Sequence, residues 1–358
     1  MIPQIEPWIG EEELSQLQEV VADRWITEGK KTQQFEERIR DYTQAKHAIS
    51  ICNGTAALYV CLKALGIGPG DDVLVPDLTF IATANAVIMA GATPVFVDVD
   101  SSTLTMDPVK AQEAITVHTK AIMPVHLYGV AADMEALLRV ARGRGLALVE
   151  DAAQGIGVMA RNRHVGTIGD IGILSFYGNK TITCGEGGMI LTQNDALAKK
   201  CWMLKNHGRE VKGTFIHPTI GYNFCLTDLQ AAVGLAQFGK LPAILEHKRR
   251  IRETYERLLG PLDDVAFPDP HPGRVDWFTS IIVDDPAALA DALKEKGIGS
   301  RRFFYPLHRQ PAFSHFPKRE FPVTDDAYDH GLSLPSTATI PESDIRKVCD
   351  AIRDFFKK

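Results

Sequence analysis

One lysine of the sequence combines a reactive side chain with a position that could shelter it. The apolar run Ile171–Phe176 is followed by Gly178, Asn179 and Lys180, and the glycine-rich stretch Gly185–Gly188 then opens the next apolar run. A lysine held in a mostly apolar cleft has a lowered pKa, and its neutral amine attacks aldehydes. The segment is not a P-loop, because Asn179 interrupts the Gly-Lys pair and a strand follows where a P-loop requires a helix. A solvent-exposed loop lysine is the alternative interpretation.

An acidic segment follows another apolar run. Asp151 comes directly after the run Leu146–Glu150, and Gln154 lies a few positions further along the chain. A buried carboxylate without a partner is strongly destabilising, so Asp151 must be paired, hydrated or hydrogen-bonded. The protonated ring nitrogen of a cofactor is one suitable partner. A structural salt bridge is the other interpretation that the sequence leaves open.

A third segment could hold a phosphate group. Gly54 and Thr55 stand at the start of the apolar-periodic segment 55–65, which predicts a helix. The start of a helix offers unpaired backbone N–H groups and the positive end of the helix dipole, and both favour an anion. The alternative is that Thr55 only caps the helix after a glycine turn.

Short apolar runs alternate with helical patterns through the first two thirds of the chain. The runs are apolar at successive positions, which is typical of strands buried on both faces. They predict an α/β fold in which helices flank a mostly parallel sheet, with the ligand site beyond the carboxyl ends of the strands. Polar residues at those ends are Thr79, His126, Asp151, Gln154 and Lys180. The predicted strands are Asp72–Pro76, Pro94–Asp98, Ala121–Val125, Leu146–Glu150, Ile171–Phe176 and Gly188–Thr192, and the predicted helices include Thr55–Leu65, Ala82–Met89 and Asp133–Arg142.

The pattern changes near Leu241. We expect a large domain over residues 1–240 and a small C-terminal α+β domain over residues 241–358, because strand and helix patterns both recur in this last part. Its basic stretch is interpreted as a solvated helix face. The expected segments are the basic helix Glu246–Arg252, the Pro-rich link Phe267–Gly273, the apolar run Phe278–Val283 and the helices Pro286–Lys296 and Glu342–Phe356.

Composition excludes several classes of protein. With 358 residues, a net charge of -6 and 45% hydrophobic residues, the chain has the balance of an ordinary globular protein that is too long for one core. It has no Lys/Arg block for nucleic-acid binding and no apolar run near the roughly 20 residues that cross a bilayer. The 6 cysteines and 11 histidines lack metal-ligand spacing, so we expect no metal site. The start of the chain lacks the features of a secretory signal, and we expect the cytoplasm.

Taken together and in order, these segments resemble the DegT/DnrJ/EryC1/StrS family of nucleotide-sugar aminotransferases, within the fold-type I group. The resemblance covers essentially the whole chain. It implies a large and a small domain, with pyridoxal 5′-phosphate as cofactor and pyridoxamine phosphate as its intermediate form. The motifs that carry it are Trp25–Gly29, Asn53–Thr55, Val75–Thr83, Pro94–Asp100, Pro124–Gly129, Glu150–Gln154, Ser175–Gly188 and Gly221–Phe224.

The resemblance also implies how the cofactor is held. Lys180 would bond to the cofactor aldehyde and later move a proton between the amine carbon and the cofactor carbon. Asp151 would pair with the pyridinium nitrogen. Gln154 would hydrogen-bond the ring hydroxyl, while Phe80 would stack on the ring face.

The cofactor phosphate would be held by residues of two subunits. Gly54, Thr55 and Ser175 would bind it from one chain, and Asn223 would reach it from the partner subunit. The resemblance therefore implies a homodimer with shared active sites. One departure from the family pattern is Cys225, which stands where many members have an arginine and concerns contacts near the subunit interface.

The implied reaction is ping-pong. L-glutamate would donate the amino group and leave as 2-oxoglutarate, and the pyridoxamine form would then aminate a ketone on a nucleotide-linked deoxysugar. Segments 178–188 and 301–308 look closest to the GDP-perosamine synthases, which aminate C4 of GDP-4-keto-6-deoxymannose. Relatives that act on dTDP- or UDP-linked sugars share most of these motifs. Within this branch we expect Tyr305, His308 and Arg301 to contact the sugar nucleotide, and an arginine can bind its diphosphate.

Two other classes share the fold. A 3-dehydratase that uses pyridoxamine phosphate carries histidine where this chain has Lys180. A non-catalytic regulator would be expected to lack part of the set formed by Lys180, Asp151, Gln154 and the phosphate residues. The sequence keeps the whole set, which favours the aminotransferase.

Overall fold

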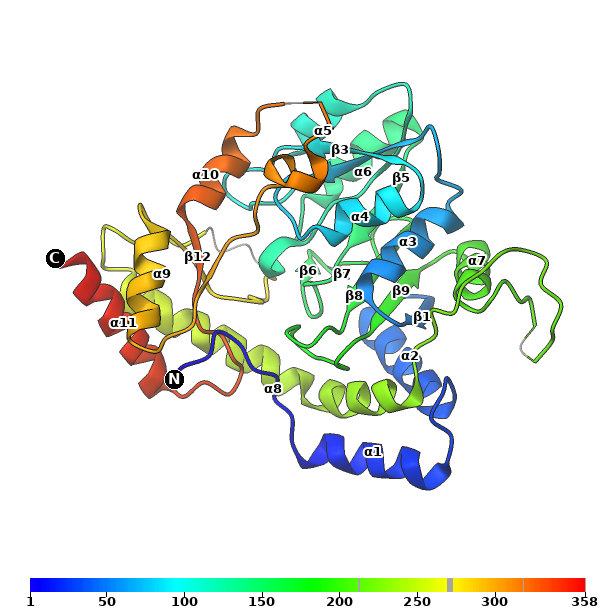
Figure 1. Ribbon diagram of the computed structural model, residues 1–358, viewed down its shortest axis with the longest axis horizontal. Helices are drawn as coiled ribbons and strands as arrows, with labels where there is room; N and C mark the ends of the chain where they lie inside the picture. Colours follow the sequence, from blue (N-terminus) through cyan, green and yellow to red (C-terminus); the bar gives the residue numbers. More distant parts are fainter. Residues whose placement is uncertain (212, 269–272, 318, 358) are drawn as a thin grey trace.

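The predicted apolar runs pair into one large sheet. The computed structural model describes residues 1–211, 213–268, 273–317 and 319–357. Within these residues seven strands pair in the order β1-β9-β8-β5-β4-β2-β3. Figure 1 labels β1, β3, β5, β8 and β9 of this sheet. Their bounds are β1 His47–Ile51, β2 Asp72–Pro76, β3 Thr93–Val97, β4 Thr119–Ile122, β5 Ala147–Asp151, β8 Ile171–Ser175 and β9 Gly188–Thr192.

The sheet is mostly parallel, as predicted. Strands β8, β5, β4, β2 and β3 run parallel to one another, whereas β9 lies antiparallel between β1 and β8. The antiparallel direction of β9 was not predicted from the sequence. No helix links β8 to β9, so the chain turns back and pairs beside β8 instead of crossing over. Strand β1 was not predicted either, because its segment mixes polar and apolar residues.

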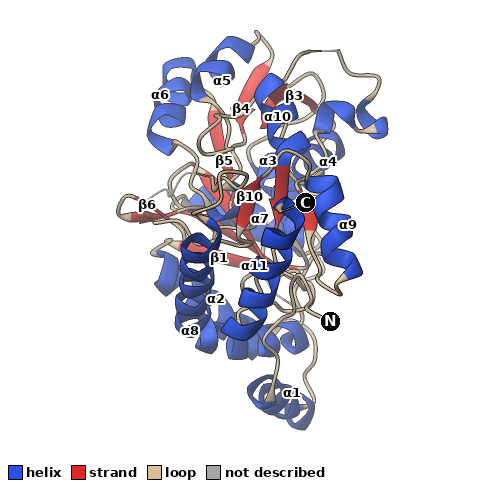
Figure 2. Cartoon of the chain, turned by 90° about the vertical axis from the view of Figure 1, so that its left-hand side faces the viewer, coloured by secondary structure: helices blue, strands red, loops and turns tan. Residues whose placement is uncertain are grey.

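Helices cover both faces of this sheet (Figures 1 and 2). The N-terminal helices are α1 Glu11–Asp23, α2 Lys30–Thr43, α3 Gly54–Ala64, α4 Ala82–Met89, α5 Pro108–Ala114, α6 Met134–Arg144 and α7 Asp195–Lys205. The long α8 Asp228–Leu259 connects to the last helices, α9 Pro286–Glu295, α10 Pro322–His330 and α11 Glu342–Phe356. A small hairpin is formed by β6 Met159–Ala160 and β7 Arg163–His164.

Alternate residues of one strand pack into different hydrophobic cores. Val73 and Val75 of β2 pack with residues of α3, α4 and α7, whereas Leu74 between them packs with residues of α5 and α6. A further core joins β8 and β9 to α2 and α8. Both faces of the sheet are therefore buried, which explains why the strands are apolar at successive positions.

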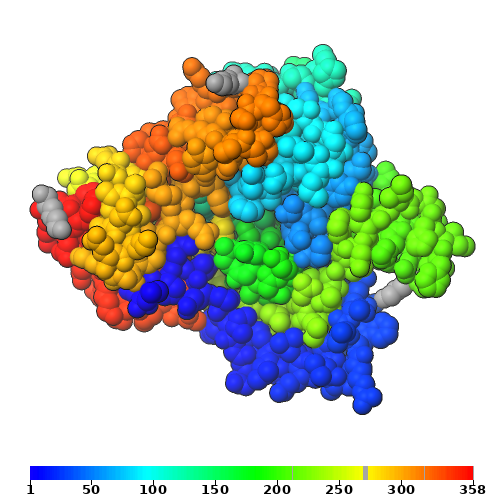
Figure 3. Space-filling model, viewed as in Figure 1, coloured from blue at the N-terminus to red at the C-terminus, as the bar shows by residue number. Residues whose placement is uncertain are grey.

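The C-terminal part has a hydrophobic core of its own. Its small antiparallel sheet contains β10 Ser280–Ile282, β11 Arg301–Arg302 and β12 Gly331–Ser333. This core also takes in residues of α8, α9 and α11, together with Ile2 from the start of the chain. In Figure 3 the blue N-terminal segment lies against the yellow and orange surface of this part, where Ile2 pairs with Ile298.

The domain boundary placed between residues 240 and 241 stays a prediction. The continuous helix α8 runs through this point, so the chain does not change element there. Residues 269–272 of the predicted Pro-rich link lie outside the described residues.

The described ranges contain neither a membrane-spanning helix nor a metal-binding cluster. None of their helices is both long and apolar enough to cross a bilayer. None of their groups of three His, Cys, Asp or Glu side chains is arranged to hold a metal ion. The cysteine side chains are free thiols, and four of them are buried.

The two-sided burial of the sheet can be tested at β2. Leu74 is 0% exposed. The substitution Leu74→Ala should lower the free energy of unfolding by about 2–5 kcal/mol, because it leaves a cavity between the sheet and its helices. Leu14 on α1 is 48% exposed, so Leu14→Ala should change it by less than about 0.5 kcal/mol. Urea unfolding measures both changes, and equal losses would contradict the packing described.

Candidate active site

A cavity of about 540 Å³ lies at the carboxyl ends of the central strands. Most of the cofactor residues expected from the sequence line this one cavity. They are Gly54, Thr55, Phe80, Asp151, Gln154, Ser175 and Lys180. Arg301, from β11 of the C-terminal part, lines it as well. Asn223, Tyr305 and His308 do not belong to its lining within the described residues.

Glycine at two positions lets the walls of this cavity approach one another. Gly188 pairs with Ile51 of β1 on one side and with Ser175 of β8 on the other. A Cβ atom on Gly188 would lie 2.8 Å from the carbonyl carbon of Asn53. A Cβ atom on Gly54 would lie 3.1 Å from Cβ and 3.2 Å from Oγ of Ser175. The start of α3 and the end of β8 therefore meet closely on one side of the cavity.

The cap of α3 differs from the one that the sequence suggested as an alternative. Asn53 is the N-cap residue, and its side-chain oxygen accepts a hydrogen bond from the backbone N–H of Ala56 at 2.8 Å. The suggestion that Thr55 caps the helix is wrong. Thr55 instead lies in the first turn and lines the cavity, where backbone N–H groups of a helix start favour an anion.

The two carboxylates at the end of β5 have different surroundings. Glu150 is 0% exposed and accepts a hydrogen bond from Nε2 of His126 at 3.0 Å, with further bonds from the backbone N–H groups of Gly166, Ile168 and Gly169. Burial alone would raise the pKa of Glu150, but these donors hold it below its usual value. Glu150 is thus a fully bonded structural carboxylate.

Asp151 has fewer donors and faces the cavity. Its carboxylate accepts hydrogen bonds from the hydroxyl of Thr83 at 2.8 Å and from the backbone N–H of Ala153 at 3.1 Å. Burial raises the pKa of Asp151 in spite of these bonds. The sequence allowed a structural salt bridge here, but the described residues give Asp151 hydroxyl and amide partners instead. A cation placed in the cavity would complete its bonding.

Gln154 is held in one orientation. Its side-chain oxygen accepts a hydrogen bond from the backbone N–H of Tyr128 at 2.6 Å, and the side chain is buried. The amide nitrogen of Gln154 is consequently the group left to donate into the cavity.

Lys180 follows β8 in a turn and extends into the cavity. Its backbone N–H donates to the carbonyl of Tyr177 at 2.9 Å. Burial lowers the pKa of the Lys180 amine to about 8, although the negative charge of Asp151 acts in the opposite direction and Arg301 lowers it further. The amine nitrogen lies 4.1 Å from the ring centroid of Trp277. Trp277 was not predicted as a site residue, because no motif surrounds it in the sequence.

This set of side chains fits pyridoxal phosphate. An amine of lowered pKa suits its aldehyde, and a buried carboxylate with only two donors suits its ring nitrogen. The close contact of Gly54 with Ser175 leaves backbone and hydroxyl groups to face a phosphate. Phe80 and Phe304, with ring centroids 5.7 Å apart, offer aromatic surface beside the ring position.

Of the three predicted substrate residues, the structure brings only Arg301 to the cavity. In His308, Nδ1 lies 2.6 Å from the carboxylate of Asp77 and Nε2 lies 3.4 Å from that of Asp325. Burial opposes protonation of His308, but these carboxylates raise its pKa overall. Tyr305 is exposed and packs edge-on against Tyr328.

Asn223 and Cys225 lie together outside the cavity lining. Asn223 is exposed and forms a backbone bridge with Asn206. The thiol of Cys225 lies 3.6 Å from the carbonyl of Lys205, a buried lysine that pairs with Glu28 at 2.5 Å. The departure from the family pattern at Cys225 thus falls beside a buried ion pair.

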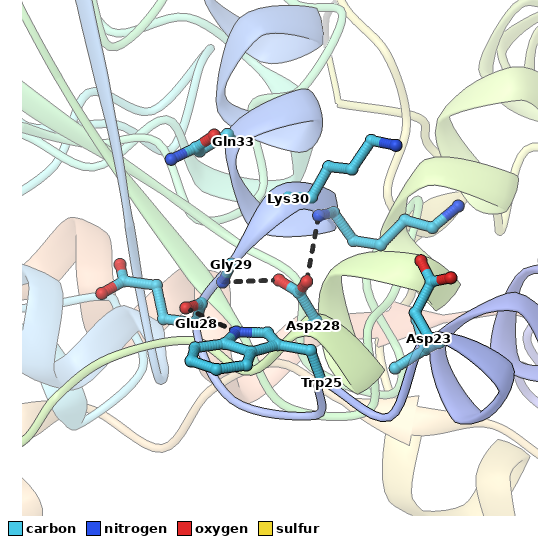
Figure 4. A pocket seen from close by; sticks show the side chains of 9 residues that line it. Asp23, Trp25, Glu28, Gly29, Lys30, Gln33 and Asp228 are labelled. Atoms are coloured by element: carbon cyan, nitrogen blue, oxygen red, sulfur yellow. Dashed lines mark hydrogen bonds between the residues drawn. The ribbon is translucent and has the colours of Figure 1, made fainter.

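A smaller cavity of about 290 Å³ contains most of the Trp25–Gly29 motif (Figure 4). Asp228 is one of the carboxylates that line it, and it accepts hydrogen bonds from the backbone N–H groups of Gly29 at 2.8 Å and Lys31 at 3.1 Å. The indole N–H of Trp25 donates to the carbonyl of Glu28 at 3.2 Å. These groups hold the start of α2 against the start of α8, which accounts for the motif structurally.

Comparison with known proteins shows the family of the chain. The model of the DegT/DnrJ/EryC1/StrS aminotransferase family matches residues 7–353. The chain is 36% identical over 365 residues to GDP-perosamine synthase of Vibrio cholerae, covering 99% of both chains. It is 40% identical over 338 residues to GDP-perosamine synthase of Caulobacter vibrioides, covering 92% of this chain and 91% of that relative.

A solved structure extends the agreement to the cofactor. NtdA of Bacillus subtilis, solved with bound cofactor PMP, is similar with a TM-score of 0.89 at 32% identity, over 97% of this chain and 82% of that chain. The resemblance drawn from the sequence and the assignment of pyridoxal phosphate are therefore confirmed. The chain belongs to the DegT/DnrJ/EryC1/StrS aminotransferase family and is a pyridoxal-phosphate-dependent sugar aminotransferase.

Proposed function

We propose that this enzyme transfers the amino group of L-glutamate to the C4 ketone of GDP-4-keto-6-deoxy-D-mannose and so produces GDP-perosamine. The observation that carries this proposal is the full-length similarity to GDP-perosamine synthases. A dTDP- or UDP-linked keto-deoxysugar is the second candidate substrate, since sugar aminotransferases with other nucleotides share most of the sequence motifs. We expect the reaction to take place in the cytoplasm.

Lys180 would act as the nucleophile and as the carrier of a proton. Bound pyridoxal phosphate supplies an aldehyde that exchanges amines and a ring that accepts electrons. Only a neutral amine attacks a carbonyl, and the lowered pKa of about 8 makes the Lys180 amine neutral far more often at pH 7 than an ordinary lysine. Its flexible stem would let the nitrogen hold a proton beside the reacting carbon.

The buried polar groups opposite Lys180 would orient the ring. Asp151 would keep the ring nitrogen protonated, because a buried carboxylate favours an adjacent cation, and Thr83 holds this carboxylate in place. The amide nitrogen of Gln154 would donate to the ring hydroxyl. Phe80 would cover one ring face.

The phosphate would lie between the start of α3 and the end of β8. Gly54 and Thr55 would offer backbone N–H groups, and Ser175 would offer its hydroxyl. Asn223 is exposed on its own chain, so we propose that it binds the phosphate in the partner subunit of a homodimer.

A surface for this homodimer lies on the same segment as Asn223. The loop after α7 projects from the body of the molecule (Figure 1) and exposes Phe215, Ile216 and Ile220. Large apolar side chains that are exposed close together mark interaction sites. A second copy of this chain is the occupant we propose, because it would also supply the missing phosphate ligand.

The two substrates would share one arginine. Within the described residues Arg301 is the arginine that lines the cavity, and ion pairs to other side chains do not occupy its guanidinium. In a ping-pong reaction the substrates bind in turn, so Arg301 could bind a carboxylate of L-glutamate first and the diphosphate of the sugar nucleotide afterwards. Contacts of Tyr305 and His308 with the sugar nucleotide remain a prediction.

The choice of sugar nucleotide decides between the two candidate substrates. A panel of GDP-, dTDP- and UDP-linked 4-keto-6-deoxysugars should give the highest kcat/KM with GDP-4-keto-6-deoxymannose and L-glutamate as donor. A preference of at least about 100-fold is expected, because a site that fits one base leaves polar groups unpaired with another. A reaction confined to a UDP sugar would overturn the perosamine assignment and leave the aminotransferase class intact.

The role of Lys180 predicts a large loss of turnover on substitution. In Lys180→Ala the steady-state rate should fall by at least about 10³-fold, because both the nucleophile and the proton carrier are removed. The control Lys120→Ala changes an exposed lysine of β4 and should keep the rate. Both variants are assayed with saturating substrates after their cofactor content has been measured, and repeated turnover by Lys180→Ala would refute the assignment.

The proposed phosphate position beside Gly54 predicts that a side chain at residue 54 weakens cofactor binding. In Gly54→Ala the new methyl group lies 3.1 Å from Cβ of Ser175 and crowds the proposed phosphate position, so the cofactor Kd should rise about 10-fold or more. Gly239 of α8 has no atom within 4 Å of such a methyl group, and Gly239→Ala is the matched control. Fluorescence titration with pyridoxal phosphate measures both, and an unchanged Kd for Gly54→Ala would place the phosphate elsewhere.

A further inference from the structure

Trp277 reaches from the C-terminal part of the chain into the active-site cavity. Its indole is 2% exposed and lines the cavity beside Lys180. The amine nitrogen of Lys180 lies 4.1 Å from the centroid of the indole ring. The indole N–H donates a hydrogen bond of 2.6 Å to the carbonyl of Asn179, the residue before this lysine. One side chain therefore contacts both the backbone and the amine of the Lys180 turn.

The backbone at and just before Trp277 is fixed from two sides. The buried amine of Lys248 on α8 donates to the carbonyl of Trp277 at 2.8 Å and to that of Ser336 at 2.9 Å. The backbone N–H of Val275 donates to the carbonyl of Gly129 at 3.0 Å. Gly129 has a φ of +83°, and a Cβ atom there would lie 1.7 Å from the carbonyl oxygen of Val275. The indole is consequently held in a set position against the Lys180 turn.

The charges around the Lys180 amine leave a specific task for the indole. Asp151 from β5 attracts the ammonium, Arg301 from β11 repels it, and Glu186 lines the same cavity. The face of an indole attracts a cation without forming a directed hydrogen bond that would have to be broken. Such a contact suits an amine that must alternate between being bonded to the cofactor and being free.

We propose that Trp277 is a positioning residue, whose indole face holds the free amine of Lys180 whenever this amine is not bonded to the cofactor. This inference rests on the proposed role of Lys180. The indole keeps the nitrogen close to the reacting carbon, and the hydrogen bond to Asn179 keeps the turn from swinging away. Trp277 and Asn179 are 98 positions apart in the sequence, so the C-terminal part of the chain takes part in the lysine chemistry.

The proposal predicts an order of pKa values for Lys180. In the full chain freed of cofactor, the pKa of Lys180 is measured from the pH dependence of its modification by an amine-reactive reagent, quantified by peptide mass spectrometry. It should be highest in the wild type, lower in Trp277→Phe and lowest in Trp277→Leu, because the cation contact weakens in that order. A fall of about 1 from wild type to Trp277→Leu is expected, equivalent to about 1.4 kcal/mol.

Matched variants separate this role from a general loss of structure. The amine nitrogen of Lys240 lies 5.9 Å from the ring centroid of Trp8. Trp8 does not line the cavity, so Trp8→Phe should leave the pKa of Lys180 unchanged. Circular dichroism and Tm verify that each variant is folded, and Trp277→Phe preserves most of the indole volume. Equal pKa values in wild type, Trp277→Phe and folded Trp277→Leu would overturn the proposal, and so would a higher pKa in the two variants, because the indole would then act on the amine by excluding water and not by attracting its charge. Because no cofactor is present, that result leaves the proposed function standing, whereas repeated turnover by Lys180→Ala overturns the role of Lys180 on which the inference rests, whatever the order of the pKa values.

Discussion

A lysine amine partly withheld from water next to a buried carboxylate is the interaction on which this active site depends. Burial lowers the pKa of Lys180 to about 8, and the opposing charge of Asp151 keeps it from falling further. The two groups come from neighbouring strands, since Asp151 of β5 pairs with Ile173 of β8, just before the lysine turn. The sheet thus provides both groups at the carboxyl ends of its strands, where loops can enclose a cofactor.

The rest of the fold supports this edge from several directions. The antiparallel strand β9 brings Gly188 between β1 and β8, which places the start of α3 against Ser175. From the other side, the C-terminal part contributes Arg301 and Trp277 to the same cavity. Lys180 is therefore enclosed by elements that are far apart in the sequence, and each wall offers one kind of group: amide, carboxylate, aromatic or cation.

The sequence revealed the features that depend on local patterns. The bounds of β2, α4 and α11 match the predicted segments Asp72–Pro76, Ala82–Met89 and Glu342–Phe356, because their periodicity is regular. Lys180, Asp151 and Gln154 were expected together, and all three line the cavity. The strand-end argument succeeded because parallel strands deliver their carboxyl ends to one edge.

Features set by long-range packing could not be predicted from local sequence patterns. The direction of β9 depends on the connection from β8, and the contact of Trp277 with Lys180 crosses much of the chain. His308 was expected to face substrate, yet its ring lies between the carboxylates of Asp77 and Asp325.

The most direct test of the account is to reduce the cofactor-loaded enzyme with borohydride and to locate the cofactor by peptide mass mapping. The account predicts one cofactor per chain, attached to Lys180, and attachment to any other residue would contradict it.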